Sequence, residues 1–95
     1  MKRISAISPG ADGAGPDDPF RHAALCLDAR GLLCPEPVLL ARARLRQMHS
    51  GDLLHVVLTD PHGPLDFEVM CLRTGNALLD RVEGEGVWHL LVRTA

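Results

Sequence analysis

Two hydrophobic periods alternate along residues 23–95, and their order leaves few folds open. Apolar side chains at every second position predict four strands, over residues 25–29, 53–59, 77–83 and 87–93. Apolar side chains three and four positions apart predict two helices, one over residues 35–48 and one from Leu65 to a closing Gly75. The order β-α-β-α-β-β predicts a two-layer α/β sandwich, in which both helices cover one face of a mixed four-stranded sheet.

The same patterns predict which side chains face the core. The strand face that packs on the helices is expected to carry Leu25, Leu27, Leu54, Val56, Leu58, Trp88, Leu90 and Val92, with His55 and His89 turned the other way. The first helix is predicted from the stripe Val38, Ala41, Leu45 and Met48, and the second from Leu65, Val69 and Leu72.

The chain of 95 residues is long enough for one domain. Residues 1–21 contain three prolines, three glycines and three aspartates with little apolar periodicity, so we expect a disordered leader there and a folded domain over residues 22–95. No apolar run approaches the roughly 18 to 20 residues that span a bilayer, and Lys2 and Arg3 are not followed by the apolar stretch of a signal peptide. We therefore expect a cytoplasmic protein that does not bind membranes, with its cysteines present as thiols.

Composition argues against two further classes of function. A net charge of −2 and only three aromatic residues disfavour direct nucleic-acid binding, which usually needs a basic surface or stacking platforms. The cysteines and histidines have neither Cys-x-x-Cys nor His-x-x-x-His spacing, so no metal site is expected. A domain this small also has little room for an organic cofactor, and we expect none.

One segment carries residues suited to chemistry, Gly31-Leu32-Leu33-Cys34-Pro35-Glu36-Pro37. Proline is best tolerated in the first turn of a helix, so Pro35 and Pro37 place Cys34 at or next to the N-cap. The helix dipole favours a thiolate there, whereas the two missing N–H groups and Glu36 oppose it, which predicts a moderately activated nucleophile. The alternative is a small buried hydrophobe; the two prolines favour a functional thiol.

The motif Leu27-Asp28-x-x-Gly31-Leu32-x-Cys34-Pro35-Glu36-Pro37 resembles the signature of the TusA/SirA-like sulfur-carrier family. The similarity continues through Gly51-Asp52-x-Leu54, Asp60-Pro61, Asp66, Cys71, Gly75 and Leu78-Leu79, and so covers about residues 25 to 93. It implies the same β-α-β-α-β-β sandwich, like the C-terminal domain of translation initiation factor 3. Three segments depart from the commonest family pattern: Asp66-Phe67-Glu68, Met70-Cys71 and Gly75-Asn76. We expect these departures to affect which partner proteins bind.

The resemblance also implies a function. Cys34 would accept sulfane sulfur as a persulfide from a cysteine desulfurase or a rhodanese-like donor and pass it to an acceptor protein, supported by Gly31, Pro35, Glu36 and Pro37. The acceptor pathways implied are tRNA thiolation, molybdenum cofactor supply and sulfur oxidation. Such a protein is a sulfurtransferase-type relay and not a stand-alone turnover enzyme, and it needs no cofactor.

Four further candidate residues each have two possible interpretations. Asp60 either caps a turn with Pro61 or lies beside the site, and Cys71 is either a half-buried structural thiol or a resolving partner of Cys34. Arg42 and Arg46 share one flank of the first helix and form either a solvated face or a docking surface for an acidic partner.

Two rival functions remain open: a regulatory or RNA-interacting module, and a redox module that cycles a Cys34–Cys71 disulfide.

Overall fold

Four strands and two helices follow one another in the predicted order. The protein is described here by a computed structural model, which defines residues 19–95. Its elements are a 3-10 helix η2 (Pro19–His22), β1 (Leu25–Ala29), α2 (Glu36–Gln47), β2 (Leu53–Leu58), α3 (Gly63–Thr74), β3 (Ala77–Gly84) and β4 (Val87–Arg93). The predicted leader lies outside the described residues except for its last three, which belong to η2.

The four strands form one mixed sheet in the order β1-β2-β4-β3. β1 and β2 are parallel, and α2 is the crossover that a parallel pair requires. β4 lies between β2 and β3 and is antiparallel to both. In register, Leu27 lies beside Val56 and Val56 beside Leu90, so these three side chains point to the same face of the sheet.

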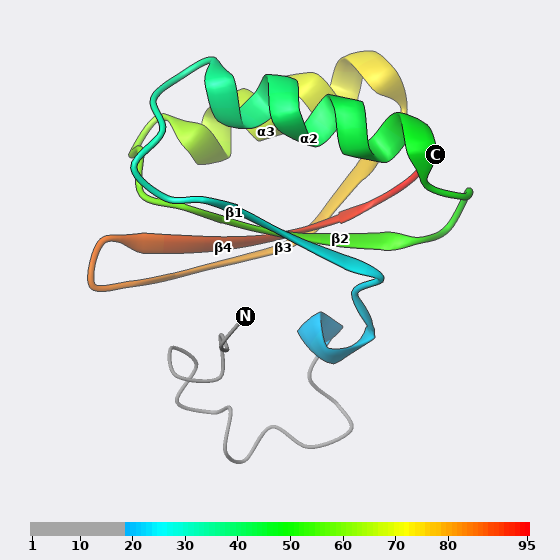
Figure 1. The fold of residues 1–95 in the computed structure, drawn as a ribbon, viewed down its shortest axis with the longest axis horizontal. Coiled ribbons are helices and arrows are strands. Elements are labelled where there is room, and N and C mark those ends of the chain that lie inside the picture. Colours follow the sequence, from blue (N-terminus) through cyan, green and yellow to red (C-terminus); the bar gives the residue numbers. More distant parts are fainter. Residues whose placement is uncertain (1–18) are drawn as a thin grey trace.

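Both helices lie side by side on that face, which confirms the predicted two-layer sandwich (Figure 1). The core between the layers contains Leu27, Ala29, Ala41, Leu45, Leu54, Val56, Leu58, Phe67, Met70, Cys71, Leu90 and Val92. Val38, Met48 and Trp88 pack against it from the edge, as expected for their stripes, whereas Leu25 is exposed.

The position of α3 was predicted correctly, but not its buried face. Leu65, Val69 and Leu72 have helical spacing, yet all three are exposed, Leu72 by 85%. The helix packs through Phe67, which is fully buried, and through its neighbours one turn along. Two apolar stripes are present on this helix, and only the one that includes the large aromatic ring faces the sheet.

The second face of the sheet is not a solvated surface. His55 and His89 point to it as predicted, but each is only 4% exposed, and Val57 and Leu91 beside them are buried too. The 3-10 helix η2 lies on this side, opposite α2 and α3 (Figure 1). The described residues include no helix long and apolar enough to cross a membrane.

Candidate functional site

Cys34 lies in the loop between β1 and α2, and its side chain is exposed. Gly31 turns the chain at the end of β1 with φ of +82°, a conformation that glycine adopts without a steric penalty. The turn is fixed by its N–H, which donates to Thr59 Oγ1 at 3.0 Å. Gly31 thus shapes the turn that precedes Cys34.

The first turn of α2 settles which of the two expected positions, at the N-cap or next to it, Cys34 takes. Pro35 is the N-cap, without a side-chain capping bond, so Cys34 precedes the cap by one residue. Pro37 is buried in the core, whereas Glu36 is exposed at the start of the helix. Pro35 and Pro37 thus bracket the first turn as predicted, and Cys34 lies next to the cap and not at it.

Asp60 holds Cys34 in place from a different part of the chain. It follows β2 and is 6% exposed. The N–H of Cys34 donates to Asp60 Oδ2 at 2.8 Å, and the N–H of His62 donates to Oδ1 at 3.0 Å. The N–H groups of His62 and then Cys34 lower the pKa of the Asp60 carboxyl below its ordinary value, because they stabilise the charged form. One carboxylate therefore ties the β1–α2 loop to the start of α3.

The two helices begin at the same side of the molecule (Figure 1). The first turn of α3 carries Asp66, whose side chain forms a hydrogen bond with that of Cys34. This bond, followed by partial burial and the charges of Asp66 and Asp60, raises the pKa of the Cys34 thiol above its ordinary value.

The expected activation of Cys34 by the helix dipole is therefore wrong for the isolated protein. Two carboxylates oppose the thiolate, and the proline cap provides no N–H to stabilise it. No separate role for Asp66 follows from the sequence, since the pattern of α3 does not show which way its first turn faces. Two signals point to Asp66: its place in the motif similarity, and its position as an acidic residue early in the helix that follows Asp60-Pro61.

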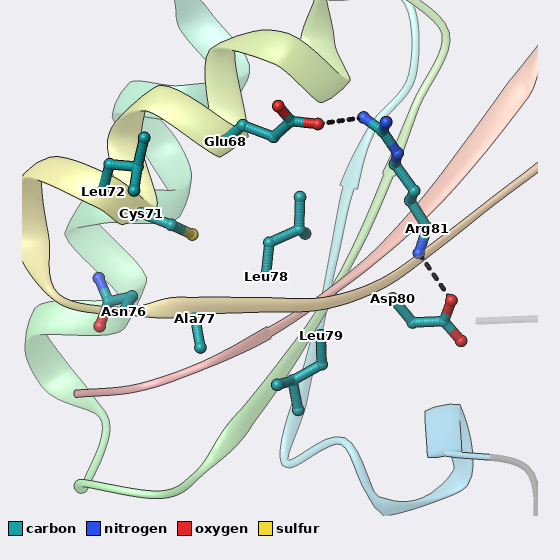
Figure 2. Close-up of a pocket in the computed structure, with 9 residues that line it drawn as sticks. All are labelled: Glu68, Cys71, Leu72, Asn76, Ala77, Leu78, Leu79, Asp80 and Arg81. Atoms are coloured by element: carbon teal, nitrogen blue, oxygen red, sulfur yellow. Dashed lines mark hydrogen bonds and ion pairs between the residues drawn. The ribbon is translucent and has the colours of Figure 1, made fainter.

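Cys71 does not join this site. It is 6% exposed, and burial raises the pKa of its thiol to about 11. Its side chain lines a groove of about 600 Å³ between α3 and β3, which Glu68 and Arg81 bridge with an ion pair (Figure 2). Cys34 is exposed in the β1–α2 loop and is not among the residues that line this groove.

Arg42 and Arg46 are exposed on α2, as is Arg44. None of the three forms an ion pair with another residue of the described chain, in contrast to Arg30 and Arg81, which bind Asp28 and Glu68. Their charges are thus available at the surface of the helix that Cys34 precedes. Among residues 19–95, no group of three or more His, Cys, Asp or Glu side chains is arranged to hold a metal ion.

Comparison with known proteins agrees with this geometry. A family model described as sulfurtransferase TusA matches residues 26–94. A protein of Neisseria meningitidis whose name marks it as a candidate sulfur carrier is 49% identical over 67 residues, which are 70% of this chain and 90% of the relative. The sulfur carrier protein TusA of Allochromatium vinosum is 45% identical over 67 residues, with 70% and 88% covered.

A solved structure supports the fold as well. The SirA-like protein of Desulfitobacterium hafniense matches with a TM-score of 0.68 at 22% identity, over 75% of this chain and 97% of that protein. The family model covers almost the whole described part of the chain, including Cys34, Asp60 and Asp66. The chain therefore belongs to the TusA sulfurtransferase family.

Proposed function

We propose that this protein is a sulfur carrier, which accepts sulfane sulfur on Cys34 as a persulfide and relays it to an acceptor protein. The observation that carries the proposal is the bond from the Cys34 N–H to the buried Asp60 carboxylate, which fixes an exposed thiol at the start of two helices. The names of the relatives, which describe sulfur carriers, support the same function.

The transfer needs one thiol and a donor persulfide. The sulfur of Cys34 attacks the outer sulfur of R–S–SH, so a new S–S bond forms as the donor's S–S bond breaks, and the donor leaves as R–S⁻. The proton of the Cys34 thiol passes to the Asp66 carboxylate and then to the leaving thiolate. The net reaction is Cys34–SH + R–S–SH → Cys34–S–SH + R–SH, which consumes no oxidant or reductant.

Delivery repeats the same exchange in the other direction. A thiolate of the acceptor attacks the outer sulfur of the Cys34 persulfide, and Cys34 is released as a thiolate that takes back a proton. Neither step requires a metal or organic cofactor. Gly31, Pro35, Glu36 and Pro37 contribute by shaping the turn, and not by contact with the transferred sulfur.

The partners follow from this chemistry. The donor is a protein that holds a persulfide, either a cysteine desulfurase or a rhodanese-like protein, and the acceptor belongs to tRNA thiolation, molybdenum cofactor supply or sulfur oxidation. Arg42 and Arg46 give the flank of α2 a positive charge that suits an acidic surface on one of these partners. We place this relay in the cytoplasm and regard the protein as a carrier and not as an enzyme that turns over alone.

Intact mass spectrometry tests the proposal. After incubation with a cysteine desulfurase and cysteine, the protein should gain about 32 Da, the mass of one sulfur atom. The gain should be absent in Cys34→Ala and should disappear from wild type when an acceptor thiol is added. Failure of wild type to gain sulfur from either a desulfurase or a rhodanese-like donor would contradict the proposal.

The rival redox module predicts that Cys71 is needed for sulfur release, whereas the sulfur-carrier proposal predicts that it is not. A Cys34–Cys71 disulfide needs a reactive second thiol, but Cys71 is buried and its pKa is about 11. We therefore expect Cys71→Ser to load and release sulfur as wild type does. Loss of release in this folded variant would favour the redox module instead.

A further inference from the structure

One edge of the sheet is formed by β3, which has β4 on one side and, within residues 19–95, no strand on the other. An edge of this kind presents backbone N–H and C=O groups with which a further strand can pair. The strand is eight residues long (Ala77–Gly84), and the proposed sulfur relay uses none of them. Cys34 follows β1, the strand at the opposite edge.

The hairpin between β3 and β4 shows which backbone groups of β3 face outward. Its two-residue turn, Glu85-Gly86, has positive φ at both positions, as in a type I′ turn. The residues that flank such a turn form a hydrogen-bonded pair, and such pairs alternate with non-bonded ones along the ladder. Arg81 and Glu83 therefore direct their backbone groups away from β4. In agreement, the N–H of Arg81 donates to Asp80 Oδ1 at 2.9 Å (Figure 2).

The two outward-facing residues carry opposite charges. When β3 pairs antiparallel with β3 of a second copy and Val82 lies opposite Val82, Arg81 of each chain lies opposite Glu83 of the other. These two side chains share one face of the strand because they are two residues apart, and their backbone groups both point to the second copy. Opposite charges at directly opposed positions stabilise a strand pair. Asp80 then lies opposite Gly84, which adds no side chain to the contact.

The neighbouring registers are unfavourable. A shift of two residues in one direction places Arg81 opposite Arg81, and a shift of two in the other direction places Glu83 opposite Glu83. Both shifts oppose like charges, which destabilises a strand pair. A shift of one residue opposes side chains that belong to different faces of the sheet. The charges of β3 thus favour the register centred on Val82.

The same pairing covers apolar surface on α3. Leu65, Val69 and Leu72 are exposed, and their spacing of four and three residues places them on one side of the helix. Leu72 lines the groove between α3 and β3, so this side of α3 borders the edge of the sheet (Figure 2). A twofold axis perpendicular to the sheet at Val82 brings the second α3 next to the first on the same face. Each apolar side then faces its own copy.

We propose that two copies of this protein associate through β3, in an antiparallel pairing centred on Val82 that joins two four-stranded sheets into one. In the dimer Arg81 lies between Glu68 of its own chain, which it already binds, and Glu83 of the second copy. The contact is small, so we expect a dissociation constant on the order of 100 μM. Association does not involve Cys34 and can be tested whether or not the chain carries sulfur.

Sedimentation velocity on the full chain tests the proposal. Between about 10 μM and about 1 mM, wild type should change from mostly monomer to mostly dimer. Arg81→Glu and Glu83→Arg each oppose like charges at both contacts, and each should weaken association more than tenfold. Arg44→Glu makes the same change of charge as Arg81→Glu but on α2, and it should associate as wild type does.

Mixing the two single variants gives the sharpest test. Both positions are negative in Arg81→Glu and positive in Glu83→Arg, so an equimolar mixture should form a heterodimer at a concentration at which each variant alone is monomeric. Leu72→Gln should also weaken association, whereas Leu39→Gln, on α2, should not. If Arg81→Glu does not fold next to Glu68, the mixture can be made with Arg81→Glu in a Glu68→Gln background. Wild type that stays monomeric at about 1 mM, or a mixture that does not associate, would overturn the proposal.

Discussion

At the scale of single residues, the site is a thiol held between two carboxylates with different functions. Asp60 binds the backbone of Cys34 and fixes its place, whereas Asp66 binds the thiol itself. The free protein therefore keeps Cys34 largely protonated, which protects an exposed thiol from unwanted reactions. In the proposed sulfur transfer, this proton is removed when a donor persulfide is present.

Asp66→Asn tests the effect of the second carboxylate. The amide removes a negative charge and can donate to a thiolate, so the pKa of Cys34 should fall. The rate of Cys34 alkylation near neutral pH should rise about three- to tenfold, in proportion to the thiolate fraction. The measurement is the pH–rate profile of iodoacetamide labelling, followed on the peptide that contains Cys34. Asp80→Asn, on β3, should leave the profile unchanged, and a higher pKa in Asp66→Asn would contradict this account.

Asp60→Asn tests the contribution of the first carboxylate to stability, through the pH dependence of unfolding. The pKa of Asp60 is lowered from 3.8 in the folded protein, so its contribution to stability is complete above that value and is lost as the pH falls below it. Urea unfolding should show a lower midpoint for Asp60→Asn than for wild type at neutral pH. The difference should be constant above about pH 4 and should shrink progressively at lower pH, and a difference that stays the same throughout this range would show that the charge of Asp60 does not contribute.

At the scale of elements, the helix starts determine the site. Gly63 opens α3 against β2, and a Cβ atom at this position would overlap Cδ1 of the fully buried Leu58. This close approach keeps the first turn of α3, and with it Asp66, against the end of β2. Asp60 and Cys34 meet at the same end of the sheet, because α2 begins there as well.

Gly63→Ala should therefore destabilise the protein although alanine favours helices. Overlap with Leu58 should lower the free energy of unfolding by about 1–2 kcal/mol, as measured by urea denaturation. Gly84→Ala is the matched control, since a Cβ there meets nothing within 4 Å and the residue has no positive φ. Gly84→Ala should change stability by less than about 0.5 kcal/mol, and equal effects of both variants would contradict the packing argument.

The order of the strands and of the two main helices could be predicted because hydrophobic period is a local property, although α3 begins at Gly63, two residues before the predicted Leu65. The buried face of α3 could not, since Leu65, Val69 and Leu72 form a helical stripe as good as that of Phe67 and its neighbours. The flanking prolines predict the place of Cys34 next to the start of α2, and the structure confirms that place. The raised pKa of Cys34 could not be predicted, because it depends on Asp66, which lies 32 residues further along the sequence. Contacts between distant segments leave no periodic signal.

At the scale of the whole molecule, the three cysteines occupy three separate environments. Cys34 is exposed where the helices begin, Cys26 is exposed on β1 and Cys71 is buried in the core. The fold therefore presents one thiol in a built site and removes another from solvent. The side of the sheet opposite the helices is occupied by an aromatic cluster that the sulfur relay does not use.

Alkylation of the native protein tests the assignment of the three cysteines to these environments. With excess reagent near neutral pH, Cys26 and Cys34 should be labelled and Cys71 should not, because its thiol is buried and has a pKa of about 11. All three should be labelled in denaturant. Labelling of Cys71 in the native state at a rate like that of Cys34 would contradict the assignment of Cys71 to the core.

The central claim, that Cys34 carries the sulfur, is tested most directly with single-cysteine variants. In Cys26→Ser, Cys71→Ala only Cys34 remains, and incubation with a persulfide donor should add one sulfur, about 32 Da, located on the peptide that contains Cys34. The complementary variant Cys34→Ala, which keeps Cys26 and Cys71, should gain no sulfur under the same conditions. Sulfur on the variant that lacks Cys34, or none on the variant that keeps it alone, would contradict the account.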